Sequence, residues 1–125
     1  MPYFGLIADE DLRDLQFHAV KFVGGAGNDW RVGKIDTAND REKYAGILLN
    51  SPNVGEAATV SRPEDLASKV KFGAAVAAGD RLMADEADDG KLIPVTGTEE
   101  YVAVSPVNGV DDEVATVFLN APTKN

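Results

Sequence analysis

The chain has 125 residues, a formal net charge of −9 and no cysteine. This length suits one domain, and the lack of cysteine excludes disulfides and thiolate metal sites. The acidic excess and the scattered basic side chains argue against nucleic-acid binding, and without a long apolar run or a leader sequence we expect a soluble, non-exported chain with no membrane contact.

Residues 1–14 differ in composition from the rest, and we predict that they form an extended N-terminal arm. An apolar cluster near the start is followed by a charged run over residues 9–14. The apolar side chains of this segment are Tyr3, Phe4, Leu6, Ile7 and Leu12. In the alternative, Asp9 caps one helical turn that carries Leu12 and Leu15.

From Leu15 onward the pattern is one of short strands separated by turns. The predicted strands span Leu15–Val23, Trp30–Val32, Ala45–Asn50, Glu56–Arg62, Lys69–Val76, Arg81–Ala84, Lys91–Val95, Glu100–Val104 and Val114–Leu119. Glycine, proline, asparagine and aspartate punctuate most of the gaps. Ser61–Ser68 favours a short helix, because Pro63 suits a first helical position and acidic residues follow it. Residues 15–125 are therefore predicted to form a single β-rich domain, all-β with at most one short helix, folded as a small sandwich or barrel.

One phrase occurs twice in the chain. Residues 51–60 read SPNVGEAATV and residues 105–117 read SPVNGVDDEVATV, each after an apolar run. Proline ends strand pairing, the asparagine and glycine that follow permit a turn, and the Ala-Thr-Val segment restarts a strand. We predict a strand, a corner and a strand in each copy, at matching corners of the two halves of a barrel. The alternative is a chance likeness between two hairpins that share common turn residues.

Residues that would support catalysis or metal binding are few. His18 is the single histidine, and strand alternation predicts that it is half-buried or exposed. Residues 24–29 (GGAGND) lack the Walker and dinucleotide patterns and precede a strand, so we interpret them as a hairpin loop. Asp85–Gly90 lacks the spacing of a calcium loop, which favours a solvated turn over a weak divalent-ion site. We therefore predict no catalytic, cofactor or metal residues, and we interpret Trp30 as a core or interface anchor.

Seven short sequence motifs, some of which belong to the repeated phrase, follow one another along the chain. They are Gly46–Asn50, Pro52, Gly55–Val60, Lys69–Val70, Ala77–Leu82, Asp85 and Gly90–Leu92. Together they resemble the capsid cement, or head decoration, proteins of tailed bacteriophages, over roughly residues 15–119. Two departures concern loop geometry. The segment Arg62–Ser68 lengthens a connection that is usually tighter, and Ala103 stands near a position where the family often has glycine.

The resemblance implies a small β-barrel or β-tulip-like module without enzymatic activity. Such proteins bind the outside of the phage head and bridge major capsid protein subunits, commonly as trimers, which reinforces the shell against the pressure of the packaged DNA. For this chain the implied partners are the major capsid protein and further copies of itself, and the implied location is the outer surface of the virion. The acidic surface suits that location, and it also has a simpler interpretation, which is solubility.

The residues predicted to contact the capsid are Tyr3, Phe4, Leu6, Ile7 and Leu12 of the arm, with Trp30 as a second candidate. An arm without a strand partner can add a strand to the sheet of a neighbour, whereas the alternative is that it packs on its own barrel. The sequence as a whole is also compatible with three other functions. They are a head-fibre or receptor- or glycan-binding module on the virion surface, an enzyme or its carbohydrate-active accessory domain, and a cellular β-protein adapted to high salt.

Overall fold

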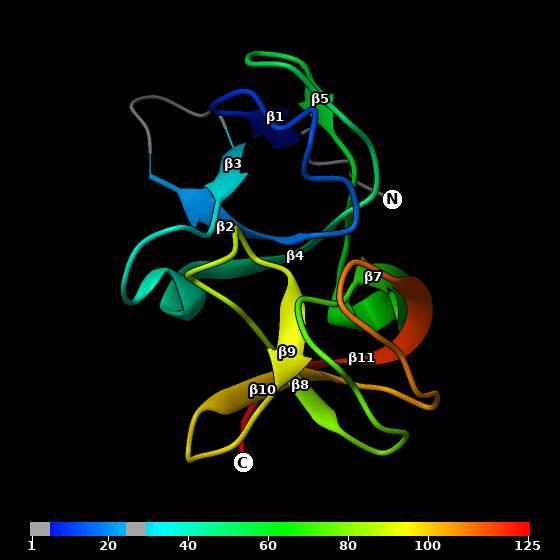
Figure 1. The fold of residues 1–125 in the computed structure, drawn as a ribbon. Coiled ribbons are helices and arrows are strands. Elements are labelled where there is room, and N and C mark those ends of the chain that lie inside the picture. Colours follow the sequence, from blue (N-terminus) through cyan, green and yellow to red (C-terminus); the bar gives the residue numbers. More distant parts are fainter. Residues whose placement is uncertain (1–5, 25–29) are drawn as a thin grey trace.

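The computed structural model describes residues 6–24 and 30–125, and nearly all of its regular structure is β-strand (Figure 1). The strands are β1 (Leu6–Ala8), β2 (Ala19–Val23), β3 (Trp30–Lys34), β4 (Tyr44–Leu48), β5 (Ala57–Ala58), β6 (Val60–Ser61), β7 (Ala67–Lys71), β8 (Arg81–Ala84), β9 (Leu92–Pro94), β10 (Glu100–Val104) and β11 (Val114–Lys124). Two short 3-10 turns, η1 (Asp40–Lys43) and η2 (Pro63–Asp65), are the helical elements of the described residues. The prediction of an all-β fold is confirmed. In this part of the chain no helix has the length and apolar character needed to cross a bilayer.

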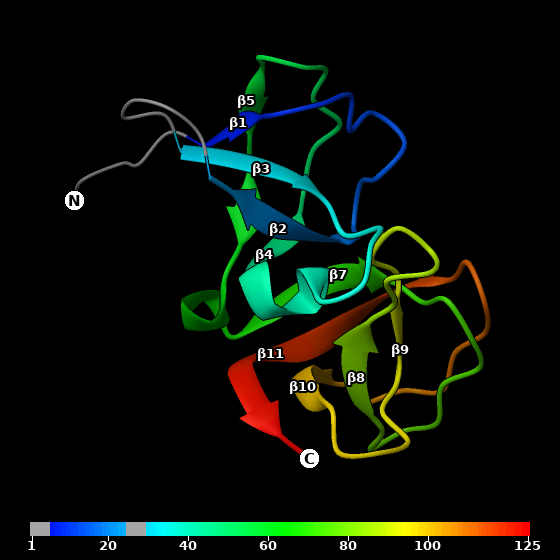
Figure 2. The same ribbon diagram turned by 90° about the vertical axis from the view of Figure 1, so that its left-hand side faces the viewer.

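The strands form two hydrogen-bonded sheets in a barrel-shaped, nearly closed arrangement. The first sheet has six strands in the order β5-β1-β3-β2-β4-β6, and the second has five in the order β7-β11-β10-β8-β9. In Figure 1 the first sheet occupies the upper half of the molecule and the second sheet the lower half. Figure 2 shows β7 next to β4, where the chain has passed from one half to the other.

The second sheet repeats the strand plan of the first. The run β3-β2-β4-β6 corresponds to the run β9-β8-β10-β11, and every neighbouring pair in both runs is antiparallel. β1 lies parallel to β3, and in the second half Phe72 makes a parallel bridge to Leu92 of β9. The echoed phrases lie at corresponding places, after β4 in one half and after β10 in the other. The doubled phrase in the sequence therefore reflects a doubled strand plan.

Each of the two corners is closed by a glutamate. In the first corner the Glu56 carboxylate accepts a hydrogen bond from the Asn53 amide at 2.6 Å, and the Glu56 amide donates to the Asn53 carbonyl at 3.0 Å. In the second corner Glu113 makes the same two bonds with Val110, at 3.0 and 3.1 Å. These bonds satisfy backbone groups that the turn would otherwise leave unpaired. The prediction of a strand, a corner and a strand in each copy is confirmed.

Two clusters of buried apolar side chains form the core. The smaller cluster, in the first half, consists of Ala8, Leu12, Leu15, Val20, Val32, Ala45, Leu48 and Ala58. The larger cluster consists of Ala19, Ile35, Ile47, Val70, Phe72, Val76, Leu82, Ala84, Leu92, Val102, Ala103, Val117 and Leu119. Because Ala19, Ile35 and Ile47 come from the first half, the larger cluster packs the two halves against each other.

Several elements differ from those predicted. The strand expected over Lys69–Val76 ends at Lys71, and the strand expected over Glu56–Arg62 is divided into β5 and β6. The strand expected over Leu15–Val23 begins only at β2, because the chain turns before it and Phe17 has a left-handed backbone with φ 71°. The helix expected over Ser61–Ser68 is reduced to η2, since Leu66 follows it at φ 68° and ends the helical path. η1 was not predicted, because a single helical turn carries too little periodicity to be recognised.

Candidate interaction surface

The arm residues that the structure describes belong to the sheet and the core. Leu6 and Ile7 lie in β1, between β3 and β5, and Leu6 packs against the smaller core cluster. Leu12 is fully buried, so it is not available to a partner and is withdrawn as a contact residue. Tyr3 and Phe4 lie outside the described residues. For the rest of this segment, packing on the chain's own barrel is the correct alternative.

Trp30 is a predicted contact residue that stays open to solvent. It begins β3 opposite Leu6 of β1, and it is 48% exposed. Residues 25–29 of the preceding loop lie outside the described residues. A large, partly exposed aromatic ring is suited to an interface, and the role of Trp30 stays a prediction.

His18 is buried, which corrects the prediction of a half-buried or exposed strand residue. It lies in a bend before β2, and its Nδ1 atom is 2.9 Å from the carbonyl oxygen of Asp89. Burial lowers the pKa of His18, the hydrogen bond to the Asp89 carbonyl opposes that change, and the charges of Lys71 and Lys91 lower the pKa further. Strand alternation did not identify the burial because the chain is not yet extended at this residue.

We expect stability to fall as the pH drops below the ordinary histidine pKa of about 6.5. Because the pKa of His18 is lower in the folded state, the unfolded chain binds the proton first, and acid favours unfolding until the folded-state pKa is also passed. Urea unfolding at about pH 7.5 and about pH 5.5, a range in which histidine is the side chain that titrates, measures the difference. The His18→Gln variant should lose less stability between these two pH values, and an equal loss would assign the effect to other groups.

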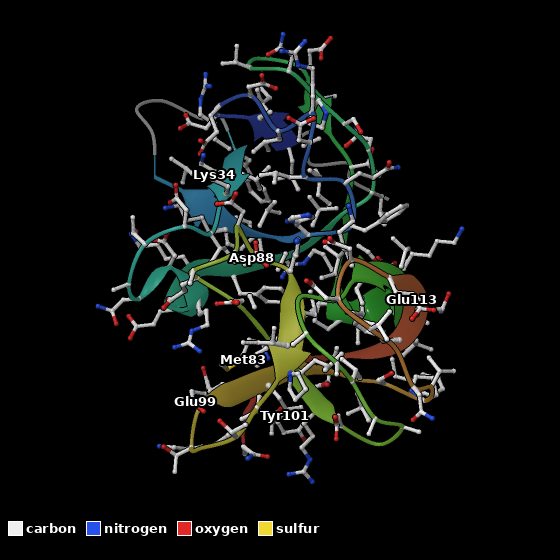
Figure 3. All side chains as sticks on the ribbon, in the orientation of Figure 1. Lys34, Met83, Asp88, Glu99, Tyr101 and Glu113 are labelled. Carbon is white, nitrogen blue, oxygen red and sulfur yellow. The ribbon has the colours of Figure 1, made fainter. Side chains whose placement is uncertain are left out.

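The acidic loop Asp85–Gly90 packs against the first half and is not simply a solvated turn. The Ala19 amide donates to the carbonyl of the last residue of this loop at 2.8 Å, and the Arg41 amide donates to the Glu86 carboxylate at 3.1 Å. Figure 3 shows Asp88 of the loop between the two halves. Among the described residues no group of three or more histidines, aspartates or glutamates is placed to hold a metal ion. The loop therefore joins the two halves.

The outer face of β7 and β11 combines apolar and cationic side chains. This β7–β11 face consists of Ala67, Lys69, Lys71, Val114, Thr116 and Phe118, and it is bordered by Leu66. The register pairs Phe118 with Ala67, Thr116 with Lys69, and Val114 with Lys71, so the six side chains lie on one side of the sheet. Phe118 is 58% exposed. On a chain with net charge −9, these residues include two lysines and no carboxylate.

Leu66 is exposed in a backbone conformation that does not favour it. Its φ is 68°, its backbone carbonyl accepts a hydrogen bond from the Leu119 amide at 2.8 Å, and it is 71% exposed. A left-handed backbone costs a residue with a Cβ roughly 1–2 kcal/mol, and glycine would make the same turn at lower cost. The exposure of this large apolar side chain beside Phe118 makes the adjoining face a candidate interaction surface.

Sequence reasoning missed the β7–β11 face, although one signal for it was present. In the strand predicted over Val114–Leu119, alternation places Phe118 on the side opposite Val117 and Leu119, which are both buried in the structure. The position of the two lysines on this face could not be predicted in the same way. It depends on the pairing register that places Lys69 of β7 next to β11, and the register between two strands cannot be read from the alternation within either strand.

A hollow of about 250 Å³ lies between η1 and the β8–β10 region. Met83 and Glu99 belong to its lining, and Figure 3 shows them on the same side of the molecule. The Tyr44 hydroxyl in its wall is buried and has no hydrogen-bond partner in the described chain. Burial raises the pKa of Tyr44, so the phenol stays protonated. The described residues that line the hollow include Glu42, Glu99 and Glu100, and they include no histidine, cysteine or serine.

Comparison with known proteins relates this fold to a phage structural protein. No family model matches the chain, and no curated protein matches it either. Among solved structures, the chain is similar to the N base of head fibre gp8.5 of bacteriophage phi29. The match has a TM-score of 0.68 at 11% sequence identity and covers 96% of this chain and 94% of that chain. At this identity the likeness establishes a shared fold.

Proposed function

We propose that this chain is a structural protein of a tailed-bacteriophage head, attached to the outside of the shell and without enzymatic activity. The observation that carries the proposal is the fold shared with a phage head-fibre base over 96% of the chain. The motif order that resembles head decoration proteins leads to the same class of protein. The exposed apolar and cationic residues of the β7–β11 face suit a protein that acts by adhesion.

In one form of the proposal the chain is a cement protein that bridges major capsid protein subunits. A single contact of about 1,000 Å² binds weakly. A homotrimer that holds several subunits at once gains roughly 10²–10⁴ in avidity without any new kind of contact. The trimer then opposes the separation of subunits under the pressure of the packaged DNA.

The structural match fits a second form equally well, in which the chain is the base of a head fibre. Both forms place the chain on the outside of the head, but they differ in the effect of attachment on the shell. A cement protein stabilises the shell because it joins neighbouring subunits. A base that only holds a fibre leaves the stability of the shell unchanged.

Purified protein mixed with phage heads that lack it should sediment with the heads and saturate at a fixed number of copies per head. An acidic protein of similar size and charge should stay in the supernatant, which controls for trapping in the pellet. If the native chain also stays in the supernatant, both forms of the proposal are wrong. The temperature at which heads release their DNA, with and without bound protein, then separates the forms, because only a cement protein raises it.

A further inference from the structure

The β7–β11 face has the composition of a contact whose partner carries negative charge. Phe118 and Val114 are exposed apolar side chains, and Lys69 between them is exposed as well. The acidic residue Glu64 lies 3.6 Å from the Arg62 guanidinium, so its charge is compensated locally. At the other end of the face, Lys71 interacts with Asp112 of the same chain, so Lys69 carries the uncompensated positive charge. On a chain with net charge −9 most surfaces repel a second copy, whereas this face attracts negatively charged ones.

The same chain has a complementary surface at its second corner. The loop Pro106–Glu113 exposes Val107 and Val110, which are 42% and 63% exposed. It continues into the exposed acidic residues Asp111–Glu113. Asp112 is paired with Lys91 of the same chain at 2.6 Å, so Asp111 carries the uncompensated charge of the loop. The bond from the Val110 amide to the Glu113 carboxylate fixes the turn, so the apolar and acidic side chains are presented together. This loop offers apolar groups for Phe118 and negative charge for the lysines.

Charge decides how two copies can meet. Across a two-fold axis the β7–β11 face would meet its own copy, and Lys69 and Lys71 of one chain would approach the same lysines of the other. Like charges placed opposite one another destabilise a contact. A contact between the face and the Pro106–Glu113 loop instead places lysines against carboxylates. The charges therefore favour a heterologous contact.

We propose that the β7–β11 face binds the Pro106–Glu113 loop of a second copy of this chain, in a head-to-tail contact. The loop ends next to Val114, and from there the strand rises about 13 Å to Phe118 at the usual spacing per residue, so the Phe118 end of the face lies apart from the loop of its own copy. Head-to-tail contacts close into a ring when the rotation between copies permits it. The inference rests on the self-association in the proposed function and assigns the surfaces that carry it.

Sedimentation velocity tests the contact on the free protein, without phage heads. The native chain should associate as its concentration rises, and added salt should weaken the association because it screens the attraction between lysines and carboxylates. Phe118→Asp on the face and Val110→Asp on the loop should each weaken association by about tenfold or more, as at interface hot spots. Val54→Asp is the matched control, because Val54 is an equally exposed valine at the first corner, and it should leave association unchanged.

Mixing the two weakened variants distinguishes a heterologous contact from a symmetric one. Phe118→Asp copies keep an intact loop and Val110→Asp copies keep an intact face, so the mixture should form pairs although neither variant associates alone. A contact that uses the face twice would not be restored by mixing. If either variant fails to fold, a charge exchange replaces it. Lys69→Glu and Asp111→Lys should each weaken association, and the double variant should recover it.

A native chain that stays monomeric at all soluble concentrations would overturn the inference. So would mixed variants, or a charge-exchanged double variant, that associate no better than the single variants. None of these outcomes decides the proposed function, because monomeric protein that still sediments with phage heads would leave that function in place. Conversely, a head-to-tail oligomer that does not bind heads would support the contact and contradict the function.

Discussion

Replacing Gly90 by alanine should destabilise the protein far more than replacing Gly79 by alanine. Both glycines have a positive φ, 88° and 93°, so each alanine introduces backbone strain of about 1–2 kcal/mol. Only at Gly90 does the added Cβ meet other atoms. It would collide with the backbone carbonyl of Ala19, whereas nothing lies within 4 Å of a Cβ at Gly79. Overpacking of this kind adds about 1–3 kcal/mol.

The comparison tests how the two halves of the molecule are joined, because the collision falls where the acidic loop packs on β2. Guanidinium unfolding should give a loss in the free energy of unfolding of about 2–5 kcal/mol for Gly90→Ala and about 1–2 kcal/mol for Gly79→Ala. The backbone φ is matched between the two sites, so the difference reports mainly the collision. Equal losses would mean that the loop does not lie against β2.

Truncating Phe72 to alanine should cost about 3–5 kcal/mol of the free energy of unfolding. Phe72 is fully buried in the core cluster that packs the two halves together. Its ring lies so close to Gly109 that a Cβ there would collide with it. The Phe72 amide also donates to the Glu113 carbonyl at 2.9 Å, and the Phe72 carbonyl accepts from the Asp112 amide at 2.8 Å. The cavity left by the ring cannot collapse easily, because the backbone around it is fixed by these bonds.

Phe118→Ala is the matched control for this truncation, because it removes the same side chain from an exposed position. Its effect on unfolding should stay within about 0.5 kcal/mol, as for most surface substitutions. Both variants should be unfolded at low protein concentration, so that self-association does not contribute to stability. A loss for Phe118→Ala as large as that for Phe72→Ala would place Phe118 in the core and remove the basis for the β7–β11 face.

The positions of the strands could be predicted because turn residues mark their ends. Arg81–Ala84 and Glu100–Val104 are predicted with the bounds that the structure has. Glycine and aspartate flank the first of these strands, and serine and proline follow the second. The doubled phrase identified the two corners for the same reason, since proline, asparagine and glycine have specific effects on the backbone. Local chemistry was therefore sufficient for the strand content and for the repeat.

The pairing of the strands could not be predicted. Alternation shows which side of a strand is buried, but it does not show which strand lies next to it. β1 lies between β3 and β5, which are distant in sequence, so Leu6 and Leu12 looked unpartnered although one packs against the core and the other lies within it. The burial of His18 was missed for a related reason. It depends on the left-handed backbone of Phe17, a residue type that does not indicate such a turn.

Proteolysis of intact phage particles, followed by quantitative mass spectrometry, measures most directly whether this chain occupies the outside of the head. We expect a fixed number of copies per particle, cleaved by protease while the packaged DNA stays protected. Particles that contain no copy of the chain, or a chain that protease reaches only after the shell has been opened, would contradict its assignment as a protein of the outer head surface.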